Sequence, residues 1–210
     1  MIINIKKGYK SVNNFFKRAF DFTTSTIGCI LISPILLIIA LLIKLTSKGP
    51  ILFKQKRVGR YGKEFNILKF RTMVVDAEKL GKQITVGNDS RITKVGSFLR
   101  KYKLDELPQL INVIKGDMSL VGPRPEVPKY VNLYSDKQRK VLEVRPGITD
   151  YASIEYRDEN TILGKVDNPE EYYVNVIMPH KIDLNMKYIE NNNVLIDIGI
   201  IFKTIFNIGK

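Results

Sequence analysis

The sequence predicts an α+β fold, a mostly helical small domain with an N-terminal re-entrant membrane helix and interfacial helices. Three observations predict it. Residues 27–43 form an uncharged apolar run with Ser33-Pro34 near its middle. Residues 51–53 and 64–70 have the composition of short strands. Most of the remaining chain has helical patterns separated by turns rich in Gly, Pro, Asn and Asp.

Composition limits the kinds of site that the chain can build. Its 210 residues are enough for one compact domain, and 44% hydrophobic with 26% charged residues is the composition of a folding chain. The single cysteine, Cys29, excludes a disulfide framework, and the single histidine, His180, excludes sites built from several histidines. A metal ion would therefore be held by carboxylates, which favours Mg²⁺.

The positive charge is concentrated in the N-terminal third. The chain has 34 basic and 21 acidic residues, a net charge of +13. Residues 1–75 contain 14 lysines and arginines but only two acids, Asp21 and Glu64. This excess surrounds the apolar run, so it favours an anionic membrane surface or a phosphate-rich ligand. The aromatic residues are not interleaved with the basic clusters, which argues against a nucleic-acid partner.

Three structures could explain the apolar run, which reads IGCILISPILLIIALLI. One straight helix of this length spans about 25 Å, slightly less than the ~30 Å hydrocarbon core of a bilayer. A signal peptide would end in small residues, whereas this run ends at Ile43-Lys44-Leu45. A kinked spanning helix and a re-entrant helix are the two structures that remain.

Charge on both flanks favours the re-entrant helix. Lys17 and Arg18 precede the run, and further lysines follow it from Lys44 onwards. The positive-inside rule places both flanks in the cytoplasm, which a single span cannot satisfy. Pro34 kinks a helix because it lacks a backbone N–H, and the Ser33 hydroxyl can satisfy a freed backbone group. We therefore expect a membrane hairpin broken at Ser33-Pro34.

The other elements follow from turn residues and periodicity. Residues 1–18 are expected to form a basic amphipathic lead-in, and a turn at 47–50 leads to the two strands, which flank a turn at 59–62. The further expected elements are helices at 73–80, 97–102, 128–142 and 170–191 (with a break at Pro179), loops at 87–90 and 121–125, and a turn at 145–147. The apolar tail 194–210 either lies on the membrane or closes the core, and a second copy of the chain or lipid could cover it.

A further helix, over residues 105–115, has clear predicted ends. Asp105 can act as its N-cap, and Pro108 falls in the first turn, where its missing N–H costs nothing. Gly116 can close the C-terminus. The adjacent carboxylates Asp105 and Glu106 would then stand where unpaired backbone N–H groups concentrate positive potential.

This acidic pair lies among basic residues in a pattern that suits phosphoryl transfer. The basic residues nearest to it in sequence are Lys69, Arg71, Arg91, Arg100, Lys101, Arg124 and Arg145. Phosphoryl transfer needs charge neutralisation, in-line positioning, a carboxylate nucleophile and a second carboxylate for Mg²⁺ or proton transfer. The alternative is an acidic pair that only complements the helix dipole. Arg124 stands between Pro123 and Pro125 on a stiff loop, prepared for a phosphate or else lying over apolar surface.

An ordered series of motifs resembles the bacterial sugar transferase family, the monotopic polyprenyl-phosphate phosphoglycosyl transferases. The resemblance runs from about residue 15 to the C-terminus and indicates the small type with only the catalytic core. Its motifs are Lys17-Arg18-Ala19-Phe20-Asp21, Ser33-Pro34, Gly49-Pro50, Phe53-Lys54-Gln55-Lys56-Arg57-Val58-Gly59, Lys69-Phe70-Arg71-Thr72-Met73, Arg91-Ile92-Thr93-Lys94-Val95-Gly96, Leu99-Arg100-Lys101, Leu104-Asp105-Glu106-Leu107-Pro108-Gln109-Leu110, Asn112-Val113, Gly116-Asp117-Met118-Ser119-Leu120-Val121-Gly122-Pro123-Arg124-Pro125 and Arg145-Pro146-Gly147-Ile148-Thr149.

The resemblance implies a reaction. Such enzymes transfer a sugar-1-phosphate from a UDP-sugar to undecaprenyl phosphate and release UMP, the first membrane step of a surface glycan pathway. By resemblance, Asp105 would be the nucleophile that forms a phosphosugar-aspartyl intermediate, and Glu106 with Asp105 would hold Mg²⁺. The implied ligands of the diphosphate or lipid phosphate are Lys69, Arg71, Arg100, Arg124 and Arg145. The segment at Asp150-Tyr151 is expected to shape the sugar or nucleotide pocket, and the C-terminal third is expected to hold the sugar specificity.

The same resemblance implies a place in the cell. The protein would be monotopic, on the cytoplasmic face of the bacterial inner membrane and in contact with its anionic lipid. Residues 1–48 would form the basic lead-in and the re-entrant membrane helix, and residues 49–210 a cytoplasmic catalytic domain. The alternative is a non-catalytic scaffold protein that binds anionic membranes through its basic N-terminal third. A homodimer is compatible with either hypothesis.

Overall fold

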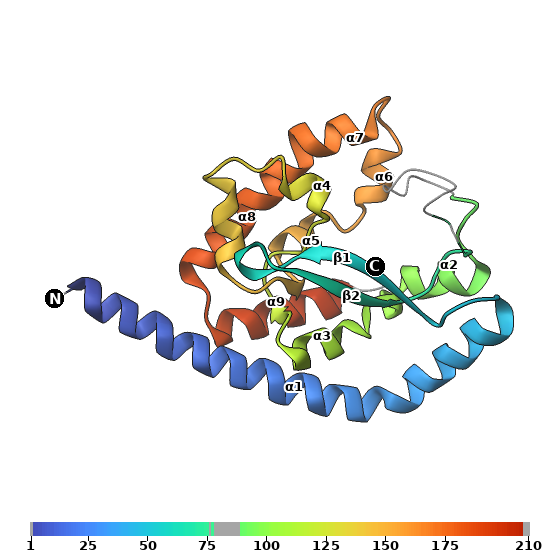
Figure 1. Ribbon diagram of the computed structural model, residues 1–210, viewed down its shortest axis with the longest axis horizontal. Coiled ribbons are helices and arrows are strands. Elements are labelled where there is room, and N and C mark those ends of the chain that lie inside the picture. Colours follow the sequence, from blue (N-terminus) through green and yellow to red (C-terminus); the bar gives the residue numbers. More distant parts are fainter. Residues whose placement is uncertain (1, 76, 78–88, 208–210) are drawn as a thin grey trace.

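The structure is a computed structural model that describes residues 2–75, 77 and 89–207, with the helical backbone alone over 2–12. A long helix, α1 (Ile2–Thr46), runs along one side of a domain of short helices and two small sheets (Figure 1). The fold is therefore mixed helix and sheet and mostly helical, as the sequence predicts.

Helix α1 continues through Pro34 without a loop. The Ser33 hydroxyl donates to the carbonyl of Ile30 at 2.8 Å, a local bond that satisfies the side chain within the helix. Figure 1 shows α1 curving around the domain, so that its last turns run in a different direction from its first. Residues 13–46 are long and apolar enough to cross or enter a membrane. Only 11% of their most apolar stretch is buried, so α1 is not the core helix of a globular domain.

A β-hairpin follows α1. Strand β1 (Leu52–Val58) pairs antiparallel with β2 (Glu64–Phe70), in a register that runs from Leu52 opposite Phe70 to Val58 opposite Glu64. The prediction of a strand at 64–70 is confirmed, and β1 is longer than the predicted 51–53. Lys, Gln and Arg along residues 54–57 have low strand propensity, but here they alternate between half-buried and exposed positions beside β2.

The predicted helix at 97–102 is confirmed as α2 (Lys94–Lys101), and Thr93 caps it by accepting from the N–H of Gly96 at 2.9 Å. The predicted single helix at 105–115 is wrong at its start. A 3₁₀ turn (Leu104–Glu106) precedes α3 (Gln109–Lys115), so Asp105 lies inside that turn and is not an N-cap. The turn follows Lys103, whose left-handed backbone separates it from α2. Gly116, with φ +91°, closes α3 as expected.

Two other predicted elements differ. The helix predicted at 128–142 is wrong: α4 (Pro128–Val131) and a 3₁₀ segment (Gln138–Glu143) are separated by turns around Ser135, whose N–H bonds to the Gln138 side chain. The described part of the helix predicted at 73–80 is not helical, because Met73 forms a bridge with Ile92. Residues 76 and 78–88, with the first half of the loop predicted at 87–90, lie outside the described residues.

A second, parallel sheet of two short strands was not predicted. It pairs β3 (Ser119–Val121) with β4 (Gly147–Thr149). Three-residue strands are too short for their alternation to be read from sequence. This pairing brings the loop that follows β3 to the turn at 145–147, and it fixes where Arg124 leaves the core.

The C-terminal part is helical: α5 (Tyr151–Glu155), α6 (Glu159–Leu163), α7 (Pro169–Tyr172), α8 (Met178–Asn191) and α9 (Val194–Asn207). The predicted helix at 170–191 forms, but the predicted break at Pro179 is wrong in place: Pro179 lies in the first turn of α8, and the irregularity is a π-helical segment (Tyr173–Ile177) before it. Helix α9 closes the core, as one of the two hypotheses for the tail expects, and its contact with a membrane stays a prediction. Its Ile200 is buried in the core, while Leu195 and Phe206 on its other side are exposed.

Two hydrophobic clusters hold the site in place. Ile67 of β2, Met118 before β3 and Ile200 of α9 belong to one cluster, which joins the hairpin to the C-terminal helices. In the other, Ile39 and Ile43 of α1 pack with Phe70 and Leu99. The C-terminal half of α1 is thereby fastened to the hairpin and to α2, the elements that carry the cationic side chains described next.

Candidate functional site

A cavity of about 230 Å³ opens between the hairpin, the 3₁₀ turn at Asp105 and the helices α2, α5, α6 and α8. Its lining residues are Lys69, Arg100, Lys103, Asp105, Glu106, Arg124, Ser153, Tyr156, Arg157, Glu159, Asn160 and Lys181. Six of these are basic and three are acidic. The cavity therefore has the charge to attract an anionic ligand, and its volume is close to the lower end of the range for small-molecule pockets.

Glu106 is the most heavily bonded acid of the cavity. Its Oε1 accepts from Lys69 Nζ at 2.8 Å and from Arg124 Nη2 at 2.5 Å, and its Oε2 lies 3.3 Å from Arg124 Nη1. Burial by itself would raise the pKa of Glu106, but the charges of Arg124 and Lys69 hold this pKa well below its usual range. Glu106 is thus ionised and holds both cations at the cavity wall.

Asp105 differs from its neighbour in both contacts and titration. Its side chain points to the same cavity, is only 8% exposed, and has no hydrogen-bond partner among the described residues. Burial raises the pKa of Asp105, and the nearby charge of Glu106 raises it further against the opposing charges of Lys69 and Arg100. A desolvated carboxylate without bonds is a stronger nucleophile than one held in an ion pair.

Arg124 reaches the cavity because its loop is tied to α5. The backbone N–H of Arg124 donates to Asp150 Oδ2 at 3.0 Å, and Asp150 Oδ1 accepts from the N–H of Ser153 at 2.5 Å. Asp150 is fully buried and caps α5. Opposite charge from Glu106 raises the pKa of Arg124, so the guanidinium stays charged. Sequence reasoning did not assign this role to Asp150, although an Asp ahead of a helix is a cap signal.

The predicted site residues separate into two groups. Lys69, Arg100 and Arg124 line the cavity with Asp105 and Glu106, as the sequence analysis expects. Arg71 and Arg145 do not line it.

Arg71 closes the end of α1. Its Nη2 donates to the carbonyl and the hydroxyl of Ser47 at 2.9 and 2.6 Å. A Cβ at Gly49, where φ is +116°, would lie 2.2 Å from Arg71 Nη1, so glycine permits this close approach. Arg145 lies at a separate pocket beside α1, and the exposed Ser33 and Pro34 remain on α1 itself.

Several cavity residues were not named from sequence, although they lie in the C-terminal third that is expected to hold the sugar specificity. Tyr156 and Arg157 follow α5, and the Lys181 ammonium on α8 donates to Glu159 at 2.9 Å. The Tyr156 hydroxyl bonds to Nδ1 of His180 at 2.7 Å, which places the single histidine at the rim. No local pattern marks these residues, because they meet only when α5, α6 and α8 pack together.

The acidic pair can be tested against a magnesium ion. Within the described residues, no group of three or more His, Cys, Asp or Glu side chains could hold a metal ion. Mg²⁺ commonly binds through one or two carboxylates, with phosphate oxygens and water completing its shell. Asp105 and Glu106 supply two carboxylates next to cations that suit phosphates, so the donor set fits Mg²⁺ bound together with a phosphorylated ligand.

The fold and the cavity together define a class of protein: a domain with a basic, carboxylate-bearing cavity for phosphorylated ligands, carried on an apolar helix that can enter a membrane. Comparison with known proteins makes the class specific. The model of the bacterial sugar transferase family matches residues 12–210, and the chain belongs to this family.

Individual relatives agree with the family. A UDP-glucose:undecaprenyl-phosphate glucose-1-phosphate transferase of Escherichia coli (strain K12) is 41% identical over 203 residues, which cover 93% of this chain and 40% of the relative. A UDP-N-acetylgalactosamine-undecaprenyl-phosphate N-acetylgalactosaminephosphotransferase of Aeromonas hydrophila is 39% identical over 91% of this chain and 43% of its own length. The chain thus spans about two fifths of these two relatives. The uncharacterized sugar transferase EpsL of Bacillus subtilis (strain 168) is 36% identical, and the match covers 90% of this chain and 85% of EpsL.

Proposed function

We propose that the protein transfers a sugar-1-phosphate from a UDP-sugar to undecaprenyl phosphate and releases UMP, as the first membrane step of a surface glycan pathway. The observation that carries the proposal is the pair Asp105 and Glu106, one unbonded and one held by cations, in a basic cavity of about 230 Å³. The names of the relatives from Escherichia coli and Aeromonas hydrophila support the substrate classes.

In the first half-reaction, a carboxylate oxygen of Asp105 attacks the β-phosphorus of the UDP-sugar. The bond between this phosphorus and the oxygen that bridges to the α-phosphorus breaks, and UMP leaves with the electron pair. The product on the protein is a phosphosugar-aspartyl anhydride. In the second half-reaction, a phosphate oxygen of undecaprenyl phosphate attacks the same phosphorus, and the Asp105 carboxylate leaves unchanged.

The other cavity residues prepare Asp105 for this attack. Lys69, Arg100 and Arg124 neutralise the charge of the diphosphate, and Glu106 keeps Lys69 and Arg124 in place through its ion pairs. Asp105 and Glu106 would also hold Mg²⁺, which when bound supplies further charge neutralisation at the phosphates. Tyr156, Arg157 and Asn160, which line another wall of the cavity, would contact the sugar or the nucleotide.

Release of UMP tests the proposal. The purified protein in nanodiscs would be incubated with undecaprenyl phosphate, Mg²⁺ and a panel of UDP-sugars, beside Asp105→Asn. We expect UMP from the native donor, none from the variant, and a 1:1 burst of UMP without undecaprenyl phosphate. Wild-type turnover in Asp105→Asn would overturn the nucleophile. Salt-sensitive vesicle binding without UMP from any donor would favour the scaffold protein instead.

We also propose that the protein is monotopic on the cytoplasmic face of the bacterial inner membrane, with α1 entering and leaving the same leaflet near Ser33-Pro34. The curvature of α1 and the positive charge on both flanks support this topology (Figure 1). Cys29→Ser variants carrying a cysteine at position 5 or 48 can be labelled in intact spheroplasts with an impermeant maleimide. We expect protection at both positions, and labelling of either would contradict the hairpin.

A further inference from the structure

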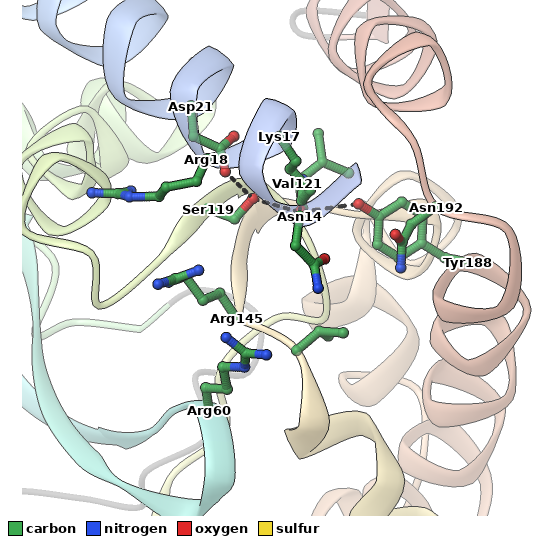
Figure 2. A pocket seen from close by; sticks show the side chains of 11 residues that line it. Asn14, Lys17, Arg18, Asp21, Arg60, Ser119, Val121, Arg145, Tyr188 and Asn192 are labelled. Carbon is green, nitrogen blue, oxygen red and sulfur yellow. Dashed lines mark hydrogen bonds between the residues drawn. The ribbon is translucent and has the colours of Figure 1, made fainter. Parts of the chain in front are cut away.

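A second pocket lies beside α1, apart from the cavity of Asp105. Its volume is about 40 Å³, which is room for a few water molecules or for one small anionic group. Figure 2 shows the side chains that line it, from α1, from the turn between β1 and β2, and from the segment before β4. Four of them are cationic, Lys17, Arg18, Arg60 and Arg145, and among the described lining residues Asp21 is the one acid.

The acid and the lysine already have partners. Asp21 accepts from the Ser119 hydroxyl at 2.7 Å through Oδ2 and from the N–H of Leu120 at 3.2 Å through Oδ1. Lys17 donates to Asp197 on α9 at 2.5 Å and to the carbonyl of Val121 at 3.0 Å. The remaining excess of positive charge in the pocket therefore belongs to the three arginines.

Arg60 and Arg145 each use one N–H donor to bond a backbone carbonyl, and their other donors remain for a ligand. Arg145 uses Nε to bond the carbonyl of Gly116 at 3.0 Å, and Arg60 uses Nε to bond that of Glu143 at 2.9 Å. Across the described part of the chain, the Nη groups of these two arginines have no hydrogen-bond acceptor. Figure 2 shows both guanidinium groups at the pocket.

Repulsion among these cations is built into the pocket. Burial lowers the pKa of Arg145, and the charges of Arg18 and Arg60 lower it further. Arg18 is fixed beside them because its Nη1 and Nη2 bond the carbonyls of Val113 and Ile114 at the end of α3. An anion between the arginines would relieve this repulsion and accept hydrogen bonds from the Nη groups of Arg60 and Arg145. A phosphate suits this position, because two of its oxygens can accept parallel hydrogen bonds from one guanidinium group.

The position of the pocket along α1 says where such an anion would come from. Asp21, which lines the pocket, precedes Ile27 by six residues, or about 9 Å along a helix. Ile27 is the first residue of the apolar run. The pocket therefore lies just N-terminal to the apolar part of α1, on the side where the phosphates of lipid headgroups are found when that run is in the hydrocarbon core.

We propose that this pocket is a phosphate site, distinct from the catalytic cavity, in which Arg60 and Arg145 bind a phosphate group presented by an anionic phospholipid or by a soluble phosphate compound. The bound phosphate would join α1, the hairpin turn and the segment before β4. It would thereby set how the domain sits on its membrane helix. This assigns Arg145 to a different phosphate from the one expected at Asp105.

Lipid retention and phosphate binding test the site. The protein in lipid-free detergent would be titrated with phosphatidylglycerol under native mass spectrometry, and separately with inorganic phosphate by thermal shift. We expect Arg60→Gln and Arg145→Gln each to weaken the tightest 1:1 binding event about tenfold, the loss of charge-assisted bonds. Lys115→Gln, which removes an exposed charge near Gly116, should change this binding less than twofold.

Competition separates the two sources and the two sites. Because competition for one site is mutual, the relative affinities decide: half-displacement of inorganic phosphate at a far lower concentration of phosphatidylglycerol identifies a lipid headgroup as the ligand, and tighter binding of UMP or inorganic phosphate than of the lipid identifies a soluble one. Arg124→Gln removes a cation from the catalytic cavity and should leave the event intact. Arg60→Lys, which keeps the positive charge, should retain part of the phosphate or lipid binding. Unchanged binding of both probes in folded Arg60→Gln and Arg145→Gln would overturn the proposal.

Discussion

Lys17 of α1 and Asp197 of α9 are 180 positions apart in the chain and form an ion pair with 2.5 Å between Nζ and Oδ2. The Asp197 carboxylate is 1% exposed and also accepts from the Tyr188 hydroxyl at 2.6 Å. This contact binds the first helix to the last one, next to the arginine pocket. The apolar helix and the domain are therefore joined by a buried polar contact as well as by the packing of Ile39 and Ile43.

Removing the lysine should destabilise the protein strongly. In Lys17→Met, Asp197 keeps its buried charge without its cation, which costs about 3–5 kcal/mol. Thermal unfolding in detergent checks this. Lys44→Met, at an exposed position of the same helix, serves as the control and should change the melting temperature little. Equal melting temperatures for the two variants would show that the pair contributes nothing.

Arg124 should not be replaceable by lysine. Its fork contacts both oxygens of Glu106, and an ammonium group cannot reproduce two parallel bonds. We expect Arg124→Lys and Arg124→Gln to lower kcat for UMP release about 100-fold or more. The loss of melting temperature should be smaller than in Lys17→Met, because Lys69 still pairs with Glu106. Lys101→Gln, which removes an exposed charge of α2, should stay within twofold. Near-wild-type turnover in Arg124→Lys would show that only the positive charge of Arg124 matters and that its two parallel bonds to Glu106 do not.

The rate of the first half-reaction should depend on the ionisation of Asp105. Burial and the charge of Glu106 raise the pKa of Asp105, so its nucleophilic form is lost at a higher pH than for an ordinary aspartate. UMP release without undecaprenyl phosphate should therefore decline, as the pH falls, already above the usual aspartate range. Omitting the lipid phosphate removes its own titration from the profile.

Glu106→Gln supplies a second test of the same group. The variant removes a negative charge beside Asp105 and frees Lys69 and Arg124 from their ion pairs. Both effects favour the ionised form of Asp105, so the acidic limb should move to lower pH even though the maximal rate falls. If the acidic limb of the pH–rate profile is the same in Glu106→Gln and in the wild type, a group other than Asp105 causes it.

The parallel pair of β3 and β4 should tolerate no side chain at Gly147. A Cβ at this position would lie 2.1 Å from the backbone nitrogen of Gly122, which cannot move away without breaking the sheet. We expect Gly147→Ala to unfold the loop that carries Arg124, with loss of activity and several degrees of melting temperature. Gly199→Ala, in α9 with nothing within 4 Å of the added carbon, should be neutral or slightly stabilising.

Local chemistry explains which elements could be predicted. The glycine stop at Gly116, the strand at 64–70 and the helix predicted at 97–102 depend on turn residues and on side-chain periodicity within a few positions. Asp105 and Glu106 are neighbours in the sequence, so the acidic pair could be predicted without any tertiary contact. Predictions failed where a turn interrupted a helical pattern, as around Ser135, because turn and helix differ there by less free energy than a few tertiary contacts supply.

The sequence by itself determined that this protein has a basic apolar helix, a carboxylate pair and enough arginines for a phosphate site. Only the tertiary structure decided which arginines line the cavity of Asp105 and which line the pocket beside α1. Arg124 reaches Glu106 because Asp150 ties its loop to α5, whereas Arg145 turns to the carbonyl of Gly116 beside α1. Such choices depend on contacts between residues far apart in the chain, whose free energy exists only once the helices and sheets have packed.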